Sequence, residues 1–418
     1  PHHEKEGSYY TIKQLWSPVQ IMNTSIDRLF DGKLSVENRY DYLNLNTCQF
    51  VWKQVKFPKV TDTSNATTQI LKEGKVQGSD VAAHATGILD LKTSILSDAD
   101  ALFLTAIDQY GHELWRWTFP IDKLNQPIEQ YSPLSNRSTY TETEKELTVK
   151  ANNRTFVFSK VDGQLKGVSI DNRKISFANG PRFIAARRAD RSLDQFYNHD
   201  DEKAKEKDRT YSEFPDAAVF TNLDVKEDRG NLIVTAHYKL GNLDKAQWTI
   251  NPSGVVTLDY TYNFSGVVDL MGIRFDYPED QVLSKRWLGA GPYRVWQNRI
   301  HGTQYDIWEN DYNDPIPGET FTYPEFKGYF GNVSWMNIRT KEGLISLTNE
   351  TPNSYIGIYQ PRDGRDRLLY TLPESGISVL NVIPPVRNKV NSTDLCGPSS
   401  QPKWVDGSKT GRIVFRFE

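Results

Sequence analysis

The 418-residue chain has few of the features that mark several common classes of protein. It contains two cysteines and three methionines, so disulfides cannot hold together a fold of this size. The formal net charge is −3, which offers no general attraction for nucleic acid or anionic lipid. No apolar run approaches the roughly 18 residues that a membrane helix needs. We therefore expect neither a nucleic-acid partner nor a membrane span, and a fold stabilised by buried apolar cores.

Short catalytic motifs are also missing from the sequence. It has no P-loop, no G-x-G-x-x-G, no H-E-x-x-H, no C-x-x-C and no G-x-S-x-G. A nucleotide site, a zinc centre and a hydrolytic triad are therefore unsupported.

Aromatic residues make up 12% of the chain, with 10 tryptophans and 21 tyrosines, and most of the sequence has the pattern of β-strands. Runs rich in β-branched and aromatic residues are separated by Gly, Asp and Asn at the spacing of a β-sandwich. No stretch before residue 120 has a helical period. The predicted strands in this first part are Val19–Thr24, Lys33–Arg39, Gln49–Phe57, His84–Lys92, Ala101–Asp108 and Glu113–Phe119.

The rest of the chain predicts a second and larger sandwich. A proline-containing polar stretch over residues 121–140 has the composition of a linker. The strands predicted beyond it are too many for one immunoglobulin-like unit and fit a two-sheet sandwich over 141–418. They are Glu146–Ala151, Thr155–Ser159, Leu165–Ile170, Leu232–Leu240, Ala246–Ile250, Val255–Phe264, Met271–Tyr277, Gly328–Arg339, Gly343–Asn349, Ser354–Gln360, Gly376–Val382 and Gly411–Phe417.

The segment Trp287–Trp335 is the densest mixture of aromatic and polar side chains in the sequence. Sugar sites need this mixture, because aromatic faces cover the C–H surface of a pyranose while charged and amide groups bond its hydroxyls. The alternative is that the aromatic side chains are core and the charged ones are loop surface. The candidate carbohydrate-binding residues are Tyr293, Arg294, Trp296, Asn298, Arg299, Glu325 and Lys327.

The same segment contains carboxylates that could serve other chemistry. Asp306, Glu309 and Asp311 could supply oxygen ligands to Ca²⁺, although turn formation explains them equally well. Calcium is therefore the one cofactor considered. A carboxylate pair for glycoside hydrolysis must lie about 5–10 Å apart, and the sequence sets no such distance.

Several stretches resemble the C-terminal part of glycoside hydrolase family 2, the β-galactosidase-like enzymes. The resemblance covers nearly the whole chain, with its stretches in the order that the family shows. The stretches are EGSYYTIKQLWSPV (Glu6–Val19), KLSVENRYDYLNL (Lys33–Leu45), TFVFSKVDGQLKGVSI (Thr155–Ile170), Trp287–Arg299, Tyr323–Trp335 and DLCGP (Asp394–Pro398).

The resemblance implies an all-β chain in which an immunoglobulin-like β-sandwich precedes a large galactose-mutarotase-like supersandwich. Residues 1–8 would be a remnant of the exit from the catalytic barrel, 9–120 the first sandwich, 121–140 the linker and 141–418 the supersandwich. The family's two catalytic glutamates lie on the barrel, so no catalytic residue is expected in this chain. The chain would be the non-catalytic part of a retaining β-glycosidase that shapes the sugar-binding rim, inactive by itself, with a carbohydrate and the missing barrel of the same polypeptide as its partners.

Departures from the family pattern leave the substrate open. Arg294 stands where the family usually has an acid, Asn298-Arg299 replaces Asp-Arg, and Cys396 occupies the place of an aromatic residue. A β-glycoside of a plant or algal polysaccharide is then an alternative to a galactoside. The alternative function is a free-standing carbohydrate-binding protein, and sugar epimerisation or polysaccharide lysis is the third.

The chain begins PHHEKEG, without an initiator methionine, which is the pattern of a cut inside a longer protein, although an artificial junction would give the same pattern. We expect a periplasmic or secreted location in preference to a cytoplasmic one. Cys48 and Cys396 fall in different predicted domains, so we expect two buried thiols and no disulfide between them.

Overall fold

The computed structural model describes residues 5, 7–62, 65–121, 128, 137–188, 211–310, 328–359, 372–386 and 397–418. Its contacts divide the chain into two units. Unit 1 comprises Pro1–Gln126, Leu288–Tyr293 and Ile300–Trp308, and unit 2 comprises Pro127–Trp287, Arg294–Arg299 and Glu309–Glu418. No helix in the described part of the chain has the length and apolarity required to cross a membrane.

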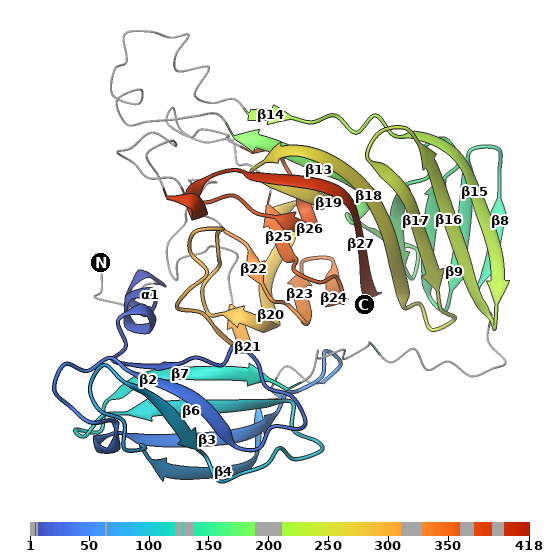
Figure 1. The fold of residues 1–418 in the computed structure, drawn as a ribbon. Coiled ribbons are helices and arrows are strands. Elements are labelled where there is room, and N and C mark those ends of the chain that lie inside the picture. The colour runs from blue at the N-terminus through green and yellow to red at the C-terminus, as the bar shows by residue number, and fades with distance from the viewer. Residues whose placement is uncertain are drawn as a thin grey trace, which may run out of the picture. The chain divides into compact units, whose positions relative to one another are not determined.

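Unit 1 pairs a three-stranded sheet of order β1-β2-β5 with a four-stranded sheet of order β4-β3-β6-β7 (Figure 1). Alternate residues of β2 and of most of β3 are buried, as expected for strands with one face on a core, whereas the first four residues of β6 are all buried. The elements are α1 (Gly7–Leu15), β1 (Val19–Ile21), β2 (Lys33–Asn38), the 3₁₀-helix η1 (Leu45–Thr47), β3 (Gln49–Lys56), β4 (Gln69–Gln77), β5 (Thr86–Asp90), β6 (Ala101–Ile107) and β7 (Glu113–Pro120).

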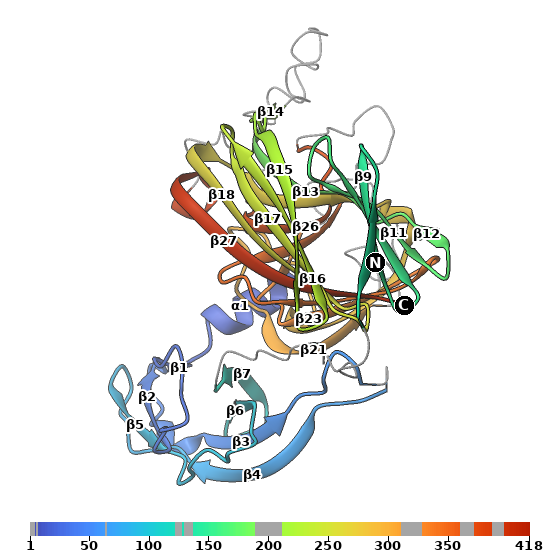
Figure 2. The same ribbon diagram turned by 90° about the vertical axis from the view of Figure 1, so that its right-hand side faces the viewer.

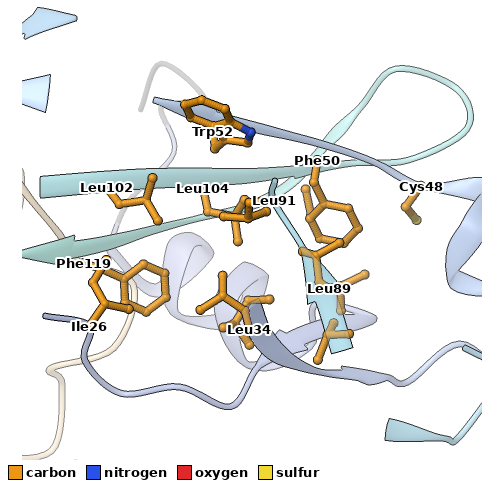
Figure 3. Packing of buried hydrophobic residues seen from close by; sticks show 14 of the residues in the cluster. Ile26, Leu34, Cys48, Phe50, Trp52, Leu89, Leu91, Leu102, Leu104 and Phe119 are labelled. Atoms are coloured by element: carbon orange, nitrogen blue, oxygen red, sulfur yellow. The ribbon is translucent and has the colours of Figure 1, made fainter. Parts of the chain in front are cut away.

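The core of unit 1 lies between these two sheets. Figure 3 shows Phe50 of β3 and Leu104 of β6 on one side and Leu34 of β2 and Leu89 of β5 on the other, all of them fully buried. Burying one such side chain stabilises the fold by about 1.5–3 kcal/mol. Cys48 belongs to this core, and burial raises the pKa of its thiol. Cys396 lies outside the described residues.

Helix α1 corrects the prediction that no helix precedes residue 120. Its sequence, GSYYTIKQL, has no residue buried in the structure. The helix has only nine residues, fewer than the roughly 11–18 over which a helical period can be recognised in a sequence.

Strand β4 was also missing from the predicted strands, because its residues are exposed or half-buried and it contains Gly74. That glycine has a packing role. A Cβ at position 74 would lie 2.4 Å from Cζ2 of Trp52, so the indole ring occupies the space that a side chain would need.

Asp100, which immediately precedes β6, gives unit 1 a pH dependence. Burial raises the pKa of its carboxyl above the ordinary value, although the N–H of Phe57, 2.8 Å from Oδ2, acts in the opposite direction. The folded chain therefore binds this proton more tightly than the unfolded chain does. The contribution of Asp100 to the free energy of unfolding falls as pH rises from the ordinary aspartate pKa through the raised one.

We predict that Asp100→Asn keeps the hydrogen bond from Phe57 and removes this dependence. At neutral pH the variant should be more stable than the parent, and the difference should shrink as the pH falls through the raised pKa of Asp100 to the ordinary aspartate value of about 4. Urea titrations of both proteins at several pH values measure the difference. Asp62→Asn, at an exposed turn, is the control. The prediction would be contradicted if the difference in the free energy of unfolding between Asp100→Asn and the parent stayed the same on acidification.

In the described part of the chain, the remaining strands form two large sheets, of 11 and 9 strands, which belong to unit 2 except for Leu288–Gly291 and Gln304–Trp308. In Figure 2, β16, β17 and β18 lie on one side and β9, β11 and β12 on the other. The 11-stranded sheet has the order β22-β25-β26-β19-β13-β11-β10-β9-β8, with β12 beside β11 and β14 beside β13. The 9-stranded sheet has the order β15-β16-β17-β18-β27-β24-β23-β20-β21.

The strands of these sheets are antiparallel in the pairings that the structure describes, and most of them match predicted runs. Their bounds are β8 (Thr139–Glu142), β9 (Glu146–Ala151), β10 (Arg154–Ser159), β11 (Leu165–Ile170), β12 (Arg173–Ile175), β13 (Ala178–Arg188), β14 (Tyr211–Glu213), β15 (Val219–Asp228), β16 (Asn231–Lys239), β17 (Leu243–Ile250), β18 (Val256–Val268), β19 (Leu270–Asp276), β20 (Val282–Gly291), β21 (Gln304–Asn310), β22 (Phe330–Gly331), β23 (Trp335–Thr340), β24 (Gly343–Asn349), β25 (Tyr355–Tyr359), β26 (Gly376–Val382) and β27 (Lys403–Phe417). The described residues also form the 3₁₀-helices η2 (Glu279–Gln281) and η5 (Pro398–Ser400).

Aromatic rings fill the space between the two sheets. Phe158 of β10 meets Trp248 of β17 at 5.9 Å between ring centroids, and Phe183 of β13 meets Tyr262 of β18 at 5.2 Å. The predicted fold class is therefore confirmed: the chain is all-β, with a smaller sandwich followed by a larger one.

Glu342, in the turn between β23 and β24 of the 9-stranded sheet, binds residues that flank β13 and β19 of the 11-stranded sheet. Its carboxylate accepts hydrogen bonds from the Ser176 N–H (3.0 Å), the Ser176 hydroxyl (2.6 Å) and the Tyr277 hydroxyl (3.2 Å). Hydrogen bonds to a charged acceptor are stronger than neutral ones.

Replacing Glu342 with glutamine exchanges one acceptor oxygen for an amide that cannot accept. We expect the free energy of unfolding to fall by about 1–2 kcal/mol, which a urea titration measures. Glu146→Gln, at an exposed strand end, is the matched control and should change stability by less than about 0.5 kcal/mol. Equal effects of the two substitutions would show that the Glu342 bonds contribute nothing.

Candidate functional site

Strand β20 places charged side chains inside unit 2. Lys285 is 1% exposed and Arg286 7% exposed, and Trp287 beside them is also buried. Successive side chains of a strand point to opposite faces. Lys285 and Trp287 accordingly both contact Phe330, whereas Arg286 lies over Trp335 at 5.8 Å.

The segment Arg294–Arg299 follows β20 and brings a further cation to the same ring. The Arg294 guanidinium lies 5.0 Å from the Phe330 centroid, and the Lys285 ammonium lies 5.8 Å from it. Arg294 is only 6% exposed. A cation over an aromatic face is stabilised by about 0.5–2 kcal/mol, more when water is excluded. The result is a buried group of donors at the start of the segment Arg294–Arg299.

Backbone hydrogen bonds fix the start of this segment. Val295 and Tyr329 form an antiparallel bridge with N···O distances of 2.7 and 2.9 Å. Their side chains pack in a buried cluster with Ile184 and Leu380 of the 11-stranded sheet. The Trp296 carbonyl accepts from the Arg299 N–H at 2.9 Å, which closes a tight turn.

Two amide side chains fix the rest of it. Asn298 Nδ2 donates to the Val386 carbonyl at 2.8 Å and to Ser400 Oγ at 2.9 Å, and Asn298 Oδ1 accepts from the Val386 N–H at 2.9 Å. Gln297 Nε2 donates to the carbonyls of Ser399 and Gln401. The segment is therefore tied to two distant parts of the chain.

The structure brings four of the predicted sugar-binding residues together. Arg294, Trp296, Asn298 and Arg299 lie in this one segment, with Arg294 buried, Trp296 and Asn298 half-buried and Arg299 exposed. A rigid loop with a half-buried indole, an exposed guanidinium and a buried cation beneath it can present an apolar face and hydrogen-bond donors to a sugar.

The other three predicted residues are not brought into this segment by the described structure. Tyr293 belongs to unit 1, where its hydroxyl donates to the Lys5 carbonyl at 2.7 Å and its ring lies 5.5 Å from that of Tyr10. Glu325 and Lys327 lie outside the described residues. Lys285 and Arg286 were absent from the predicted set, because two charged residues inside an otherwise apolar run do not distinguish a buried strand from a loop.

The calcium candidates are divided between the two units. Asp306 of unit 1 accepts from Arg116 Nη2 at 3.0 Å and from Thr68 Oγ1 at 3.1 Å. Glu309 of unit 2 lies 4.0 Å from Arg286 Nε, and Asp311 lies outside the described residues. Within the part of the chain that the structure describes, no three His, Cys, Asp or Glu side chains gather where they could hold a metal ion.

Comparison with known proteins gives one family match and several distant structural likenesses. The model of the beta galactosidase small chain family matches residues 150–381, more than half of the chain. No curated protein matches the chain.

Among solved structures, YeaD of Salmonella typhimurium, a candidate mutarotase, is 10% identical, with 70% of this chain and 96% of that one covered and a TM-score of 0.33. HI1317 is 8% identical, with coverages of 68% and 100% and a TM-score of 0.33. YidC from Thermotoga maritima is 14% identical, with coverages of 68% and 51% and a TM-score of 0.25.

Proposed function

Because the chain belongs to the beta galactosidase small chain family, we propose that it is the non-catalytic, C-terminal part of a retaining β-glycosidase of glycoside hydrolase family 2. The family match over residues 150–381 carries the proposal, since it includes the whole candidate segment Arg294–Arg299. The retaining mechanism uses two carboxyl groups about 5–5.5 Å apart. In this proposal a catalytic barrel that is not part of these 418 residues supplies both carboxyl groups.

The segment Arg294–Arg299 then shapes one side of the sugar-binding rim. Trp296 offers its half-buried indole to the C–H face of a pyranose, and Arg299 offers its exposed guanidinium to the hydroxyls. Arg294 acts beneath them as a positioning residue, because its guanidinium is already buried against Phe330. Asn298 and Gln297 hold the backbone, so the sugar meets a preorganised surface.

Sugar binding by the 418-residue chain tests this role. Ligand-observed NMR with methyl β-galactoside, methyl β-glucoside and methyl β-mannoside should detect weak, saturable binding of at least one of them. Arg299→Ala should weaken that binding about tenfold or more, because one hydrogen bond to a charged group is lost. Arg339→Ala, an exposed arginine of β23, is the control and should change nothing. Binding that survives Arg299→Ala and Trp296→Ala without change would place the sugar elsewhere and refute the rim.

A further inference from the structure

An exposed tryptophan stands at the start of β27. Trp404 is 68% exposed, although the strand that it begins is largely buried toward its end. An indole left in water forgoes the stabilisation that its burial would supply. The residues around Trp404 indicate which kind of ligand this part of the surface could bind.

The first half of β27 forms a two-stranded ribbon with the end of β18. Residues 403–408 pair with residues 263–268, whereas β17 reaches only as far as Tyr262 and β24 pairs only with residues 413–417 of β27. In Figure 1 the red strand β27 and the yellow strand β18 run side by side along their whole length.

Directly opposed residues of an antiparallel pair lie on the same face. One face of the ribbon is buried. Val405 is 8% exposed, Val268 is fully buried, and the ring of Phe264 packs against Phe183 at 5.7 Å and Phe214 at 5.3 Å.

The opposite face turns outward and carries polar groups beside the tryptophan. Its opposed pairs are Trp404 with Val267, Asp406 with Ser265, and Ser408 with Asn263. Asp406, Ser408, Ser265 and Asn263 are all exposed. The face therefore carries one indole beside the half-buried Val267, followed by a carboxylate, two hydroxyls and an amide.

This face begins close to the candidate segment. Gln297 and Asn298 hold residues Ser399, Ser400 and Gln401, and β27 starts two residues later. Four residues of extended chain span at most about 14 Å, so Trp404 lies within that distance of Ser400.

We propose that the outward face of the β18–β27 ribbon is a second glycan-binding surface, on which Trp404 stacks against a sugar unit of an extended β-linked glycan whose terminal unit lies at the Arg294–Arg299 rim. The choice of a glycan as the ligand rests on the proposed function. Residues i and i+2 of a strand are about 6.6 Å apart, so Trp404, Asp406 and Ser408 form a row along which successive units of an extended glycan can lie.

The composition of the face favours a sugar over a protein partner. The core of a protein interface is an apolar patch depleted of charge, whereas here a single aromatic side chain lies among exposed hydroxyl, amide and carboxylate groups. Such groups bond sugar hydroxyls as donors and acceptors, and the indole covers the apolar face of the ring.

Calorimetric titration of the 418-residue chain with galactohexaose, mannohexaose and cellohexaose, each β-1,4-linked, tests the proposal. At least one hexasaccharide should bind, and Trp404→Ala should weaken its binding about tenfold. Trp404→Tyr should keep most of the affinity. Trp16→Ala removes a tryptophan of unit 1 that is 80% exposed and should leave the affinity unchanged.

The outcomes separate this inference from the proposed function. Hexasaccharide binding that is equally strong in the parent and in Trp404→Ala, or no hexasaccharide binding at all, overturns the inference. If the inference is overturned in this way, methyl β-galactoside binding that depends on Arg299 but not on Trp404 would still support the proposed function of the rim. Hexasaccharide binding that depends on Trp404 without any effect of Arg299→Ala upholds the ribbon surface and removes the rim.

Discussion

Replacing Phe177 with alanine is expected to lower the free energy of unfolding of unit 2 by about 3–5 kcal/mol. Phe177 is fully buried between β12 and β13 and touches the rings of three other phenylalanines. It stacks on Phe275 of the same sheet with the ring centroids 4.7 Å apart, and it meets Phe415 and Phe417 of the opposite sheet at 5.3 and 5.2 Å. The substitution therefore removes the centre of the contact between the two sheets and leaves a cavity.

A urea titration followed by tryptophan fluorescence measures this loss. Trp248 reports on the same region, because its ring lies 6.0 Å from that of Phe275. Tyr140→Ala, on the exposed strand β8, is the control and should change stability by no more than about 0.5 kcal/mol. A loss below about 1.5 kcal/mol for Phe177→Ala would mean that the two sheets do not depend on this ring for their contact.

Replacing Asn298 with alanine should free the candidate segment from Val386 and Ser400, while Gln297 still holds it to Ser399 and Gln401. Three hydrogen bonds of its side chain are lost, and each contributes about 0.5–1.5 kcal/mol, so we expect a local loss of about 2–3 kcal/mol. Hydrogen exchange of the Val386 backbone amide should become faster, because its acceptor is the side-chain oxygen Oδ1 of Asn298. Methyl β-glycoside binding should weaken at least tenfold, since the rim is no longer preorganised.

Asn222→Ala tests whether these effects are specific. Asn222 is an exposed asparagine of β15, and its loss should alter neither the exchange of Val386 nor sugar binding. If Asn298→Ala changes the exchange but not the binding, then the segment is a structural connection and not part of a sugar rim.

Strands with alternating side chains or a short uninterrupted apolar run could be predicted closely from the sequence. β9, β11, β24 and β26 have the bounds that were predicted, because their side chains alternate or form short apolar runs between turn residues. β20 could not be predicted in this way. All of its residues except Leu283 are buried, and they include Lys285 and Arg286, whose charges break the apolar run. Their burial depends on Phe330 and Trp335, which lie about 45 residues later in the sequence.

The candidate site was predicted as one continuous stretch, and the structure divides it. Tyr293 belongs to unit 1, whereas the next six residues belong to unit 2. The anchors of Asn298 lie 88 and 102 residues further along the chain, so no local pattern could identify them. The sequence composition could indicate sugar-binding residue types in this region, but only the tertiary contacts show that Asn298 holds the backbone and that Arg299 is exposed.

The most direct test of the proposed function is the hydrolysis of 4-nitrophenyl β-D-galactoside, β-D-glucoside and β-D-mannoside by the purified 418-residue chain. Release of nitrophenolate at saturating substrate would be measured by absorbance. The account predicts no release above the rate without protein, because both carboxyl groups of the retaining mechanism would belong to the barrel. Steady turnover that co-purifies with the chain and disappears when a glutamate of this chain is changed to glutamine would contradict it.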